Sequence, residues 1–318
     1  MEYRRFGRTG LQVSVMGLGS GGPSLLGQRS GVPEAEAHRV VHRALDHGIN
    51  LIDTAAGYIE SEAILGRALA GIPRDSYVLC TKCSPGRRIP GTDEFEFRTP
   101  EELVASCERS LERLKTDYLD VLQFHAVLPE TYPHTRDVLM PVMRRLQEQG
   151  KIRFVGISDG FEHDHHNEAL QMALADDLFD TMMVGYNILT PAPAAQVFPQ
   201  ALKQDVGVII MCAVRRRMGR PDQLAALIAE LKQNGELPAS VPDEQPLDWL
   251  IHGDVQSITD AAYKFAADHP AVSSVLTGTA SVEHLEANVR AILGDPLPAA
   301  DKERLKAWFG PIGRNLGN

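Results

Sequence analysis

Four ionisable side chains stand at, or just after, the ends of short apolar runs of the sequence. Asp53 ends the run in NLIDTAAGY, Lys82 ends LCTK, His125 ends LDVLQFH, and Tyr58 follows Asp53 by five residues. A tyrosine with an ordinary pKa of about 10 donates its proton poorly at neutral pH, and a nearby ammonium group lowers that pKa. With Lys82 as that ammonium group, we expect Tyr58 to protonate an alkoxide as it forms.

The other two residues complete this hypothesis. Asp53 can hold Lys82 charged and oriented, and His125 can donate a hydrogen bond that polarises a carbonyl group. A single Asp, Lys or His at a strand end is as often structural as catalytic. The hypothesis therefore depends on a fold that brings all four side chains together.

The pattern of the whole chain predicts such a fold. Short β-branched runs alternate with amphipathic helical patterns, which is typical of βαβ units, and no linker-like or low-complexity segment interrupts them. The predicted strands are residues 16–18, 50–54, 77–82, 118–125, 153–158, 180–186, 208–214 and 274–277. Eight strands separated by helices predict a (β/α)8 TIM barrel, with residues 1–318 as a single domain and the active site at the carboxyl ends of the strands.

Three further segments refine this prediction. Residues 99–115 carry an apolar stripe and begin with Thr99, Pro100 and Glu102, which predicts a helix with a capping box. Residues 3–6 and 11–15 flank a glycine-containing turn and predict an N-terminal β-hairpin over the bottom of the barrel. The long interval after the seventh strand, with helical patterns at 221–231 and 258–268, predicts an enlarged loop at the catalytic mouth.

Composition and charge limit the classes of partner. The 318 residues are 43% hydrophobic and carry a formal net charge of −10, so the average field repels nucleic acids and anionic membranes. The sequence contains no apolar stretch of about 18 residues and its first residues are charged, so we expect no membrane span and a cytoplasmic protein. Four scattered cysteines agree with a reducing compartment. Cys80 and Cys83 form a CxxC, but strand alternation sends them to opposite faces, which disfavours a redox pair.

The chain resembles the aldo-keto reductases over almost its whole length. The motifs that carry the resemblance are RRFGRTGLQVSVMGLGS, ALDHGINLIDTAAGY followed by SEAILGRAL, SLERLKTDYLDVLQFH, KIRFVGIS, FDTMMVGYN and SSVLTGTASVEHLEANV. The resemblance implies a nicotinamide-dependent carbonyl reductase or alcohol dehydrogenase that acts on an aldehyde, ketone or sugar. It also implies that Asp53, Tyr58, Lys82 and His125 are the four catalytic residues, with Tyr58 as general acid or base.

The same resemblance implies positions that bind the nicotinamide, and several of them depart from the family pattern. Ser158 matches a serine that binds the carboxamide, but Asp159 replaces the asparagine expected after it. Met183 stands where a glutamine is expected, and Met211 stands where an aromatic residue usually stacks on the ring. Methionine can pack on a ring but cannot replace the hydrogen bonds of glutamine. Ile59, after Tyr58, replaces a glycine.

A second set of residues is expected to hold the adenosine phosphates. Gly278 and Thr279 precede a helix that we expect to start at Ser281, and a helix amino terminus attracts anions. His284 and Asn288 lie further along that helix. Arg215 and Arg216, with Arg217 and Arg220, follow the seventh strand and either close over the pyrophosphate or form a solvated basic turn.

Both NAD and NADP remain candidate cofactors, with NAD mildly favoured. Family members that prefer NADPH commonly carry a lysine and an arginine at the positions of Gly278 and His284, and both charges are absent here. The arginines after the seventh strand could instead reach the 2′-phosphate of NADP from the enlarged loop.

Two alternative functions remain open. One is a cofactor-binding regulatory subunit on the same fold with little turnover. The other is a metal-dependent hydrolase that uses His163, His165 and His166, although zinc needs three or four ligands in fixed geometry and a solvated loop is the favoured interpretation. We expect no bound metal. The residues leave the substrate's identity, the direction of reaction and the oligomeric state open.

Overall fold

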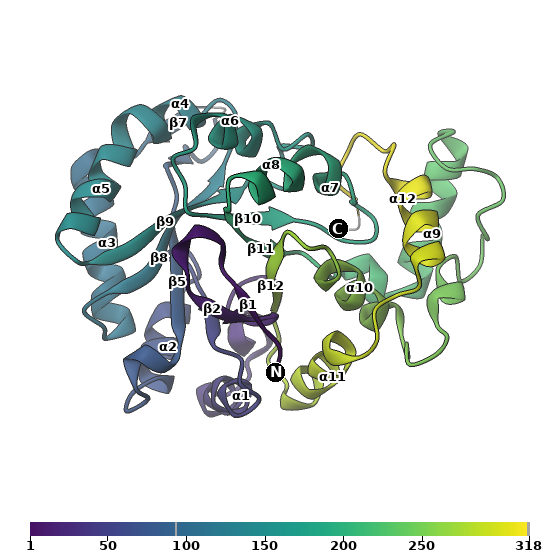
Figure 1. The fold of residues 1–318 in the computed structure, drawn as a ribbon, viewed down its shortest axis with the longest axis horizontal. Coiled ribbons are helices and arrows are strands. Elements are labelled where there is room, and N and C mark those ends of the chain that lie inside the picture. The colour runs from purple at the N-terminus through teal and green to yellow at the C-terminus, as the bar shows by residue number, and fades with distance from the viewer. Residues whose placement is uncertain (93, 317–318) are drawn as a thin grey trace.

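The computed structural model describes residues 1–92 and 94–316. Within these residues eight parallel strands close into a barrel in the spatial order β10, β11, β12, β3, β4, β5, β8, β9 (Figure 1). The strands are β3 (Met16–Gly19), β4 (Leu51–Asp53), β5 (Val78–Cys83), β8 (Leu119–Val127), β9 (Ile152–Asp159), β10 (Thr181–Gly185), β11 (Gly207–Met211) and β12 (Val272–Thr277). The predicted (β/α)8 barrel is confirmed, and each predicted strand overlaps one of these.

Helices cover the outer face of the barrel, as βαβ connections require. They are α1 (Glu34–Asp46), α2 (Ser61–Ala68), α3 (Pro100–Leu114), α4 (Tyr132–His134), α5 (Met140–Glu148), α6 (Glu168–Asp176), α7 (Pro193–Gln196), α8 (Phe198–Lys203), α9 (Pro221–Gln233), α10 (Ile258–Ala267), α11 (Val282–Leu293) and α12 (Ala299–Phe309). Because both faces of a strand are covered, every residue of β4, β5 and β10 is buried.

The helix α3 begins as its sequence predicts. The Thr99 side chain accepts a hydrogen bond from the Glu102 backbone N–H at 3.2 Å, and the Glu102 carboxylate accepts one from the Thr99 N–H at 2.8 Å. This capping box satisfies two backbone donors that would otherwise lack a partner. It fixes the start of the helix that carries Ser106, Arg109 and Arg113 past the end of β5.

The amino-terminal segment closes the bottom of the barrel. The strands β1 (Tyr3–Arg5) and β2 (Gln12–Ser14) pair antiparallel, and Phe6 lies fully buried in an apolar cluster with Leu51, Val121 and other inward-facing residues. Gly7 has a φ of +51°, and a Cβ there would lie 2.2 Å from the backbone nitrogen of Gly207, which starts β11. The hairpin and its place under the barrel are therefore confirmed.

The excursion after β11 packs against the carboxyl-terminal helix. It contains α9 and leads into α10, and Figure 1 shows it together with α12 at one side of the barrel. The rings of Trp249 and Trp308 lie 5.5 Å apart, and the Arg304 guanidinium covers both of them at 4.3 and 4.4 Å. The enlarged loop is confirmed.

A second excursion, which the sequence pattern did not predict, lies between β5 and α3. Its strands β6 (Gly86–Arg88) and β7 (Phe95–Phe97) form a short antiparallel hairpin. Residues Ser84 and Arg98 flank this hairpin, and the Arg98 Nε donates to the Ser84 carbonyl oxygen at 2.7 Å. Among the described residues, no helix is long and apolar enough to cross a membrane.

Candidate active site

A buried ion pair lies at the carboxyl ends of β4 and β5. The Lys82 Nζ donates to Asp53 Oδ2 at 2.5 Å and to the Thr54 carbonyl oxygen at 2.7 Å, and both charged side chains are almost fully buried. Gln123, on the next strand β8, donates to the other oxygen of Asp53 at 3.3 Å. Burial alone lowers the pKa of Lys82, but the attraction and hydrogen bond of Asp53, together with Tyr58, outweigh burial and raise that pKa. The lysine therefore stays protonated inside the barrel.

Tyr58 and His125 lie next to this pair. The Lys82 Nζ is 5.1 Å from the centroid of the Tyr58 ring, and the Tyr58 and His125 rings meet edge to face with centroids 5.5 Å apart. The loop after β4 carries Tyr58, and β8 carries His125. The structure thus brings together all four side chains that the sequence singled out, from three neighbouring strands.

The pKa of Tyr58 corrects one expectation. Burial raises this pKa above its usual value, and the ammonium of Lys82 lowers it by less than burial raises it. The expected net lowering is therefore wrong, because the phenol is half-buried in the barrel mouth and an ionised ring loses solvation there. Tyr58 holds its proton at neutral pH.

His125 is neutral at the same pH. Burial, followed by the positive charge of Lys82, lowers its pKa to about 3. A neutral imidazole carries one N–H donor, so His125 can give a hydrogen bond to an oxygen without adding a charge.

Two residues of this group escaped the sequence analysis. Gln123 precedes His125 by two positions, so the two-residue period of a strand puts both on one face, and that signal could have found it. Gly21 follows β3 and lies against the Tyr58 ring, where an added Cβ would come within 2.4 Å of Tyr58 Cε2. Only glycine leaves room for the ring in this position.

Next to β8 in the barrel, β9 ends with Ser158 and Asp159. Both are buried, and Asp159 accepts a hydrogen bond from the Gly185 backbone N–H at 3.3 Å through Oδ2. Its second oxygen, Oδ1, is buried and has no hydrogen-bond partner within the described residues. Burial raises the pKa of Asp159 to about 8, although the Gly185 hydrogen bond opposes that shift. The carboxyl is therefore mostly neutral at pH 7.

The two methionines of the predicted nicotinamide pocket lie at different depths. Met183 is buried in the inward-facing apolar cluster with Phe6 and Ile209, and Met211 is partly exposed and packs against that cluster. Met183 therefore fills the barrel core, whereas Met211 reaches its upper edge.

The predicted phosphate-binding segment has the expected helix start. Ser281 is the N-cap of α11 and accepts a hydrogen bond from the His284 backbone N–H at 3.3 Å. Gly278 is exposed, and Thr279 is buried and binds the Ser281 N–H through its hydroxyl at 3.1 Å. The Asn288 amide donates to Thr277 Oγ1 at 2.8 Å, so this side chain already anchors α11 to β12.

The arginines after β11 divide into two kinds. Arg215 is buried, pairs with Glu162 at 2.8 Å and covers the Phe161 ring at 4.8 Å, which ties this loop to the one after β9. Arg216 is exposed. Only Arg216 of these two presents its side chain to solvent.

Neither alternative cluster gathers into a reactive centre. His163, His165 and His166 are all exposed, which confirms the solvated loop, and no group of three His, Cys, Asp or Glu side chains in the described residues could hold a metal ion. Cys80 faces the inner cluster and Cys83 the outer core, so the prediction that they lie on opposite faces is confirmed.

Comparisons with known proteins agree with this geometry. The model of the aldo/keto reductase family matches residues 17–308, so the chain belongs to the aldo/keto reductase family. It is 30% identical over 317 residues to the L-galactose dehydrogenase of Arabidopsis thaliana, across 96% of this chain and 92% of that protein. It is 32% identical over 226 residues to the NADH-specific methylglyoxal reductase of Escherichia coli (strain K12), across 66% of each chain.

A solved structure also places the chain among the aldo-keto reductases. The aldo-keto reductase AKR11C1 from Bacillus halodurans, in its holo form, superposes with a TM-score of 0.72 at 25% sequence identity, over 96% of each chain. The family and these relatives are oxidoreductases.

Proposed function

We propose that this protein is an NAD(P)-dependent oxidoreductase that interconverts a carbonyl group and an alcohol, with Tyr58 as general acid and base. The observation that carries the proposal is the buried Asp53–Lys82 ion pair beside Tyr58 and His125. The chain's membership of the aldo/keto reductase family supports this class of reaction.

Each of the four residues has a different role in proton transfer. His125, neutral because of its lowered pKa, donates a hydrogen bond to the carbonyl oxygen and polarises it. Tyr58 gives its proton to that oxygen as negative charge develops, and Lys82 stabilises the phenolate that remains. Asp53 keeps Lys82 charged and aimed at this point. The nicotinamide, when bound, supplies or accepts the hydride.

The ends of β9 and β10 fit a nicotinamide carboxamide. The neutral form of Asp159 has one O–H donor and one carbonyl acceptor, the same pair of functions as the asparagine that it replaces. Its buried Oδ1, which has no partner in the described residues, is available for such a group. Ser158 lies beside it at the end of β9. The amino terminus of α11, with Gly278, Thr279 and His284, is the place we propose for the adenosine phosphates.

For the cofactor we propose NAD over NADP. Neither Gly278 nor His284 supplies a permanent positive charge for a 2′-phosphate, and the relative from Escherichia coli is named as NADH-specific. Arg216 and Arg220, both exposed after β11, are the residues on which an NADP preference would depend.

For the substrate we propose a small aldehyde, ketone or sugar. The names of two relatives point in this direction, since one is a dehydrogenase of L-galactose and the other a reductase of methylglyoxal.

The test is steady-state turnover of the full chain with NADH and NADPH against a panel that includes methylglyoxal, glyceraldehyde and aldohexoses. We expect carbonyl-dependent oxidation of the cofactor with at least one of these. Binding of the cofactor without turnover of any of them would favour the regulatory subunit.

A further inference from the structure

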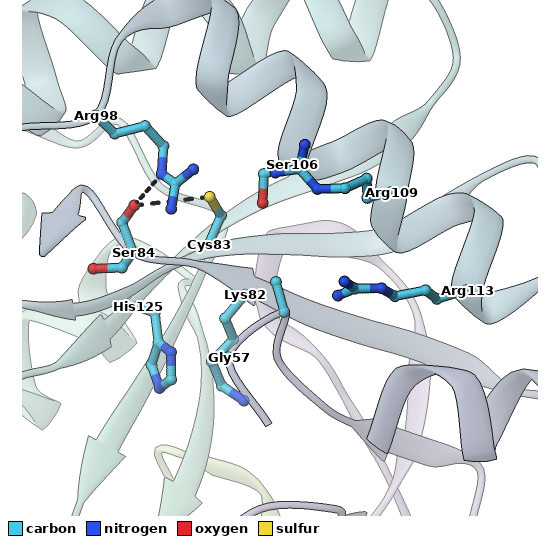
Figure 2. Close-up of a pocket in the computed structure, with 10 residues that line it drawn as sticks. Gly57, Lys82, Cys83, Ser84, Arg98, Ser106, Arg109, Arg113 and His125 are labelled. Atoms are coloured by element: carbon cyan, nitrogen blue, oxygen red, sulfur yellow. Dashed lines mark hydrogen bonds between the residues drawn. The ribbon is translucent and has the colours of Figure 1, made fainter. Parts of the chain in front are cut away.

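A cavity of about 240 Å³ adjoins the catalytic group on the side of α3. Lys82 and His125 form one wall together with the loop after β4. The opposite wall consists of basic and hydroxyl side chains from the end of β5, the start of α3 and the inner face of that helix. Figure 2 shows them around the opening: Ser84, Arg98, Ser106, Arg109 and Arg113.

The charges around this cavity do not balance. Two positive groups have partners, because Lys82 pairs with Asp53 at 2.5 Å and Arg113 pairs with Glu62 at 3.3 Å. Among the described residues, the Arg98 guanidinium donates only to neutral carbonyl oxygens, at 2.7 and 3.4 Å. Within the described part of the chain, the Arg109 side chain makes no hydrogen bond or ion pair.

No anionic side chain in the lining offsets these two guanidinium groups. None of the described residues around the cavity is a carboxylate. Cys83 stays a neutral thiol, because burial raises its pKa by more than Arg98 lowers it. A locally positive cavity is unusual in a chain whose formal net charge is −10.

The size and the donors of the cavity define what it can hold. Pockets for drug-sized ligands measure about 300–1,000 Å³, so this one suits a smaller group. Guanidinium groups present paired N–H donors that match the oxygens of a carboxylate or a phosphate, and they are charged at every ordinary pH.

We propose that this cavity, lined by Arg98, Arg109 and Arg113, binds a phosphate or carboxylate group next to the catalytic residues. The group belongs either to the carbonyl substrate or to a free anion. The first source rests on the proposed function and makes the substrate an anionic carbonyl compound; the second does not depend on it.

The first experiment measures binding of inorganic phosphate to the full chain by calorimetry, with and without NADH. We compare the parent with Arg109→Gln and with a matched control, Arg145→Gln. Arg145 is also an exposed helical arginine, but it lines a separate hollow that contains Glu101. We expect Arg109→Gln to weaken phosphate binding about tenfold, the loss of roughly one charge-assisted hydrogen bond, and Arg145→Gln to leave it within twofold. Equal phosphate affinity in the two variants, or no phosphate binding by the parent, overturns the proposal.

The second experiment identifies the source of the anion. It compares kcat/KM for glyceraldehyde 3-phosphate and for glyceraldehyde in the parent and in Arg109→Gln. A selective loss of about tenfold for the phosphorylated aldehyde, carried by KM, supports a substrate group. Unchanged constants for both aldehydes, combined with lost phosphate binding, support a free anion. If neither aldehyde nor any other carbonyl is turned over while Arg109→Gln still loses phosphate binding, the proposed function fails and the anion site stands.

Discussion

The two sides of the barrel mouth differ in how their buried carboxyl groups are hydrogen-bonded. On the side of β4, β5 and β8, Asp53 receives hydrogen bonds from both Lys82 and Gln123, and Lys82 also reaches the Thr54 carbonyl oxygen. On the side of β9 and β10, Asp159 receives one long hydrogen bond from Gly185, and its other oxygen is buried with no partner in the described residues.

This difference separates two kinds of function. On the first side both oxygens of the buried carboxylate have partners without a ligand, so the Asp53–Lys82 pair is held in a fixed geometry before anything binds. The second side leaves one buried oxygen, Asp159 Oδ1, open for a group that arrives from outside. Substitutions on the first side should change rate and stability, whereas substitutions on the second should change affinity for the cofactor and its pH dependence.

The largest effect is expected from Lys82→Met. Removal of one partner leaves Asp53 buried without its counter-charge, which costs about 3–5 kcal/mol in the free energy of unfolding. The same change should raise the apparent pKa of Tyr58 in the pH profile of residual activity, because the phenolate loses its nearest positive charge. Denaturant unfolding and pH–rate profiles measure the two effects.

A matched control for this variant is Lys264→Met. Lys264 is equally buried, but its partner Asp254 keeps half of its side chain in solvent, so the carboxylate left behind stays hydrated. We expect a smaller loss of stability there. A Lys82→Met variant that loses less than the control, with an unchanged pH profile, contradicts the role of the buried pair.

The second prediction concerns the pH dependence of cofactor binding. Asp159, with a pKa raised to about 8, loses its donor as the pH rises through that value. The dissociation constant for NADH should therefore rise between pH 7 and 9, by about tenfold per pH unit above the pKa if the proton is required. In Asp159→Asn the amide keeps both donor and acceptor, and the dissociation constant should be nearly constant over this range. Fluorescence titration distinguishes the two; a parent that is as flat as the variant contradicts the assignment.

The same carboxyl should affect stability with a defined sign. Its folded pKa lies above the unfolded value of about 3.9, so its stabilising contribution is complete below about pH 4 and is lost as the pH rises through about 8. Thermal melting should show Asp159→Asn more stable than the parent at pH 9, with a smaller difference at pH 5.

The third prediction concerns the relative affinity for NADH and NADPH. Because Gly278 and His284 carry no permanent charge, NADPH should not bind more than about tenfold more tightly than NADH, which corresponds to about 1.4 kcal/mol. His284→Arg should improve NADPH affinity by about tenfold through a charge-assisted hydrogen bond to the 2′-phosphate. Dissociation constants at two salt concentrations provide the measurement. A larger NADPH preference in the parent that shrinks with salt would overturn the choice of NAD and implicate the exposed Arg216 and Arg220.

The smallest expected effect lies beside Tyr58. Ile59 has a φ of +50° and is 61% exposed, a left-handed conformation that a β-branched residue adopts only with strain. Ile59→Gly should raise the free energy of unfolding by up to about 1 kcal/mol, reduced by the greater freedom of glycine in the unfolded chain. A stability loss above about 1 kcal/mol would show that the isoleucine side chain makes contacts that outweigh the strain.

Sequence alone predicted the parts of the molecule that depend on local patterns. Most barrel strands follow β-branched runs, the start of α3 follows its capping box, and Ser281 caps α11 as expected. The convergence of Asp53, Lys82 and His125 follows from strand order, because consecutive strands are neighbours in a barrel.

The remaining features depend on contacts between distant segments. The pairing of Arg215 with Glu162 joins two loops that are 53 residues apart. The pKa of Tyr58 depends on the depth of its burial, which no local pattern records, so burial outweighs the expected effect of Lys82. The cavity lined by Arg98, Arg109 and Arg113 likewise forms only because α3 packs near the end of β5.

The most direct test of the central claim is the single-turnover rate of Tyr58→Phe with bound reduced cofactor and saturating carbonyl substrate, alongside its dissociation constant for that cofactor. The variant removes only the proton donor and keeps the ring against Gly21. Tyr3→Phe is the control, since it removes a hydroxyl that binds the Gly48 carbonyl oxygen in the hairpin segment under the barrel. We expect a rate lower by about 10²- to 10⁴-fold for Tyr58→Phe, with cofactor affinity within twofold of the parent and an unchanged rate for Tyr3→Phe. A Tyr58→Phe rate within a few-fold of the parent would contradict it.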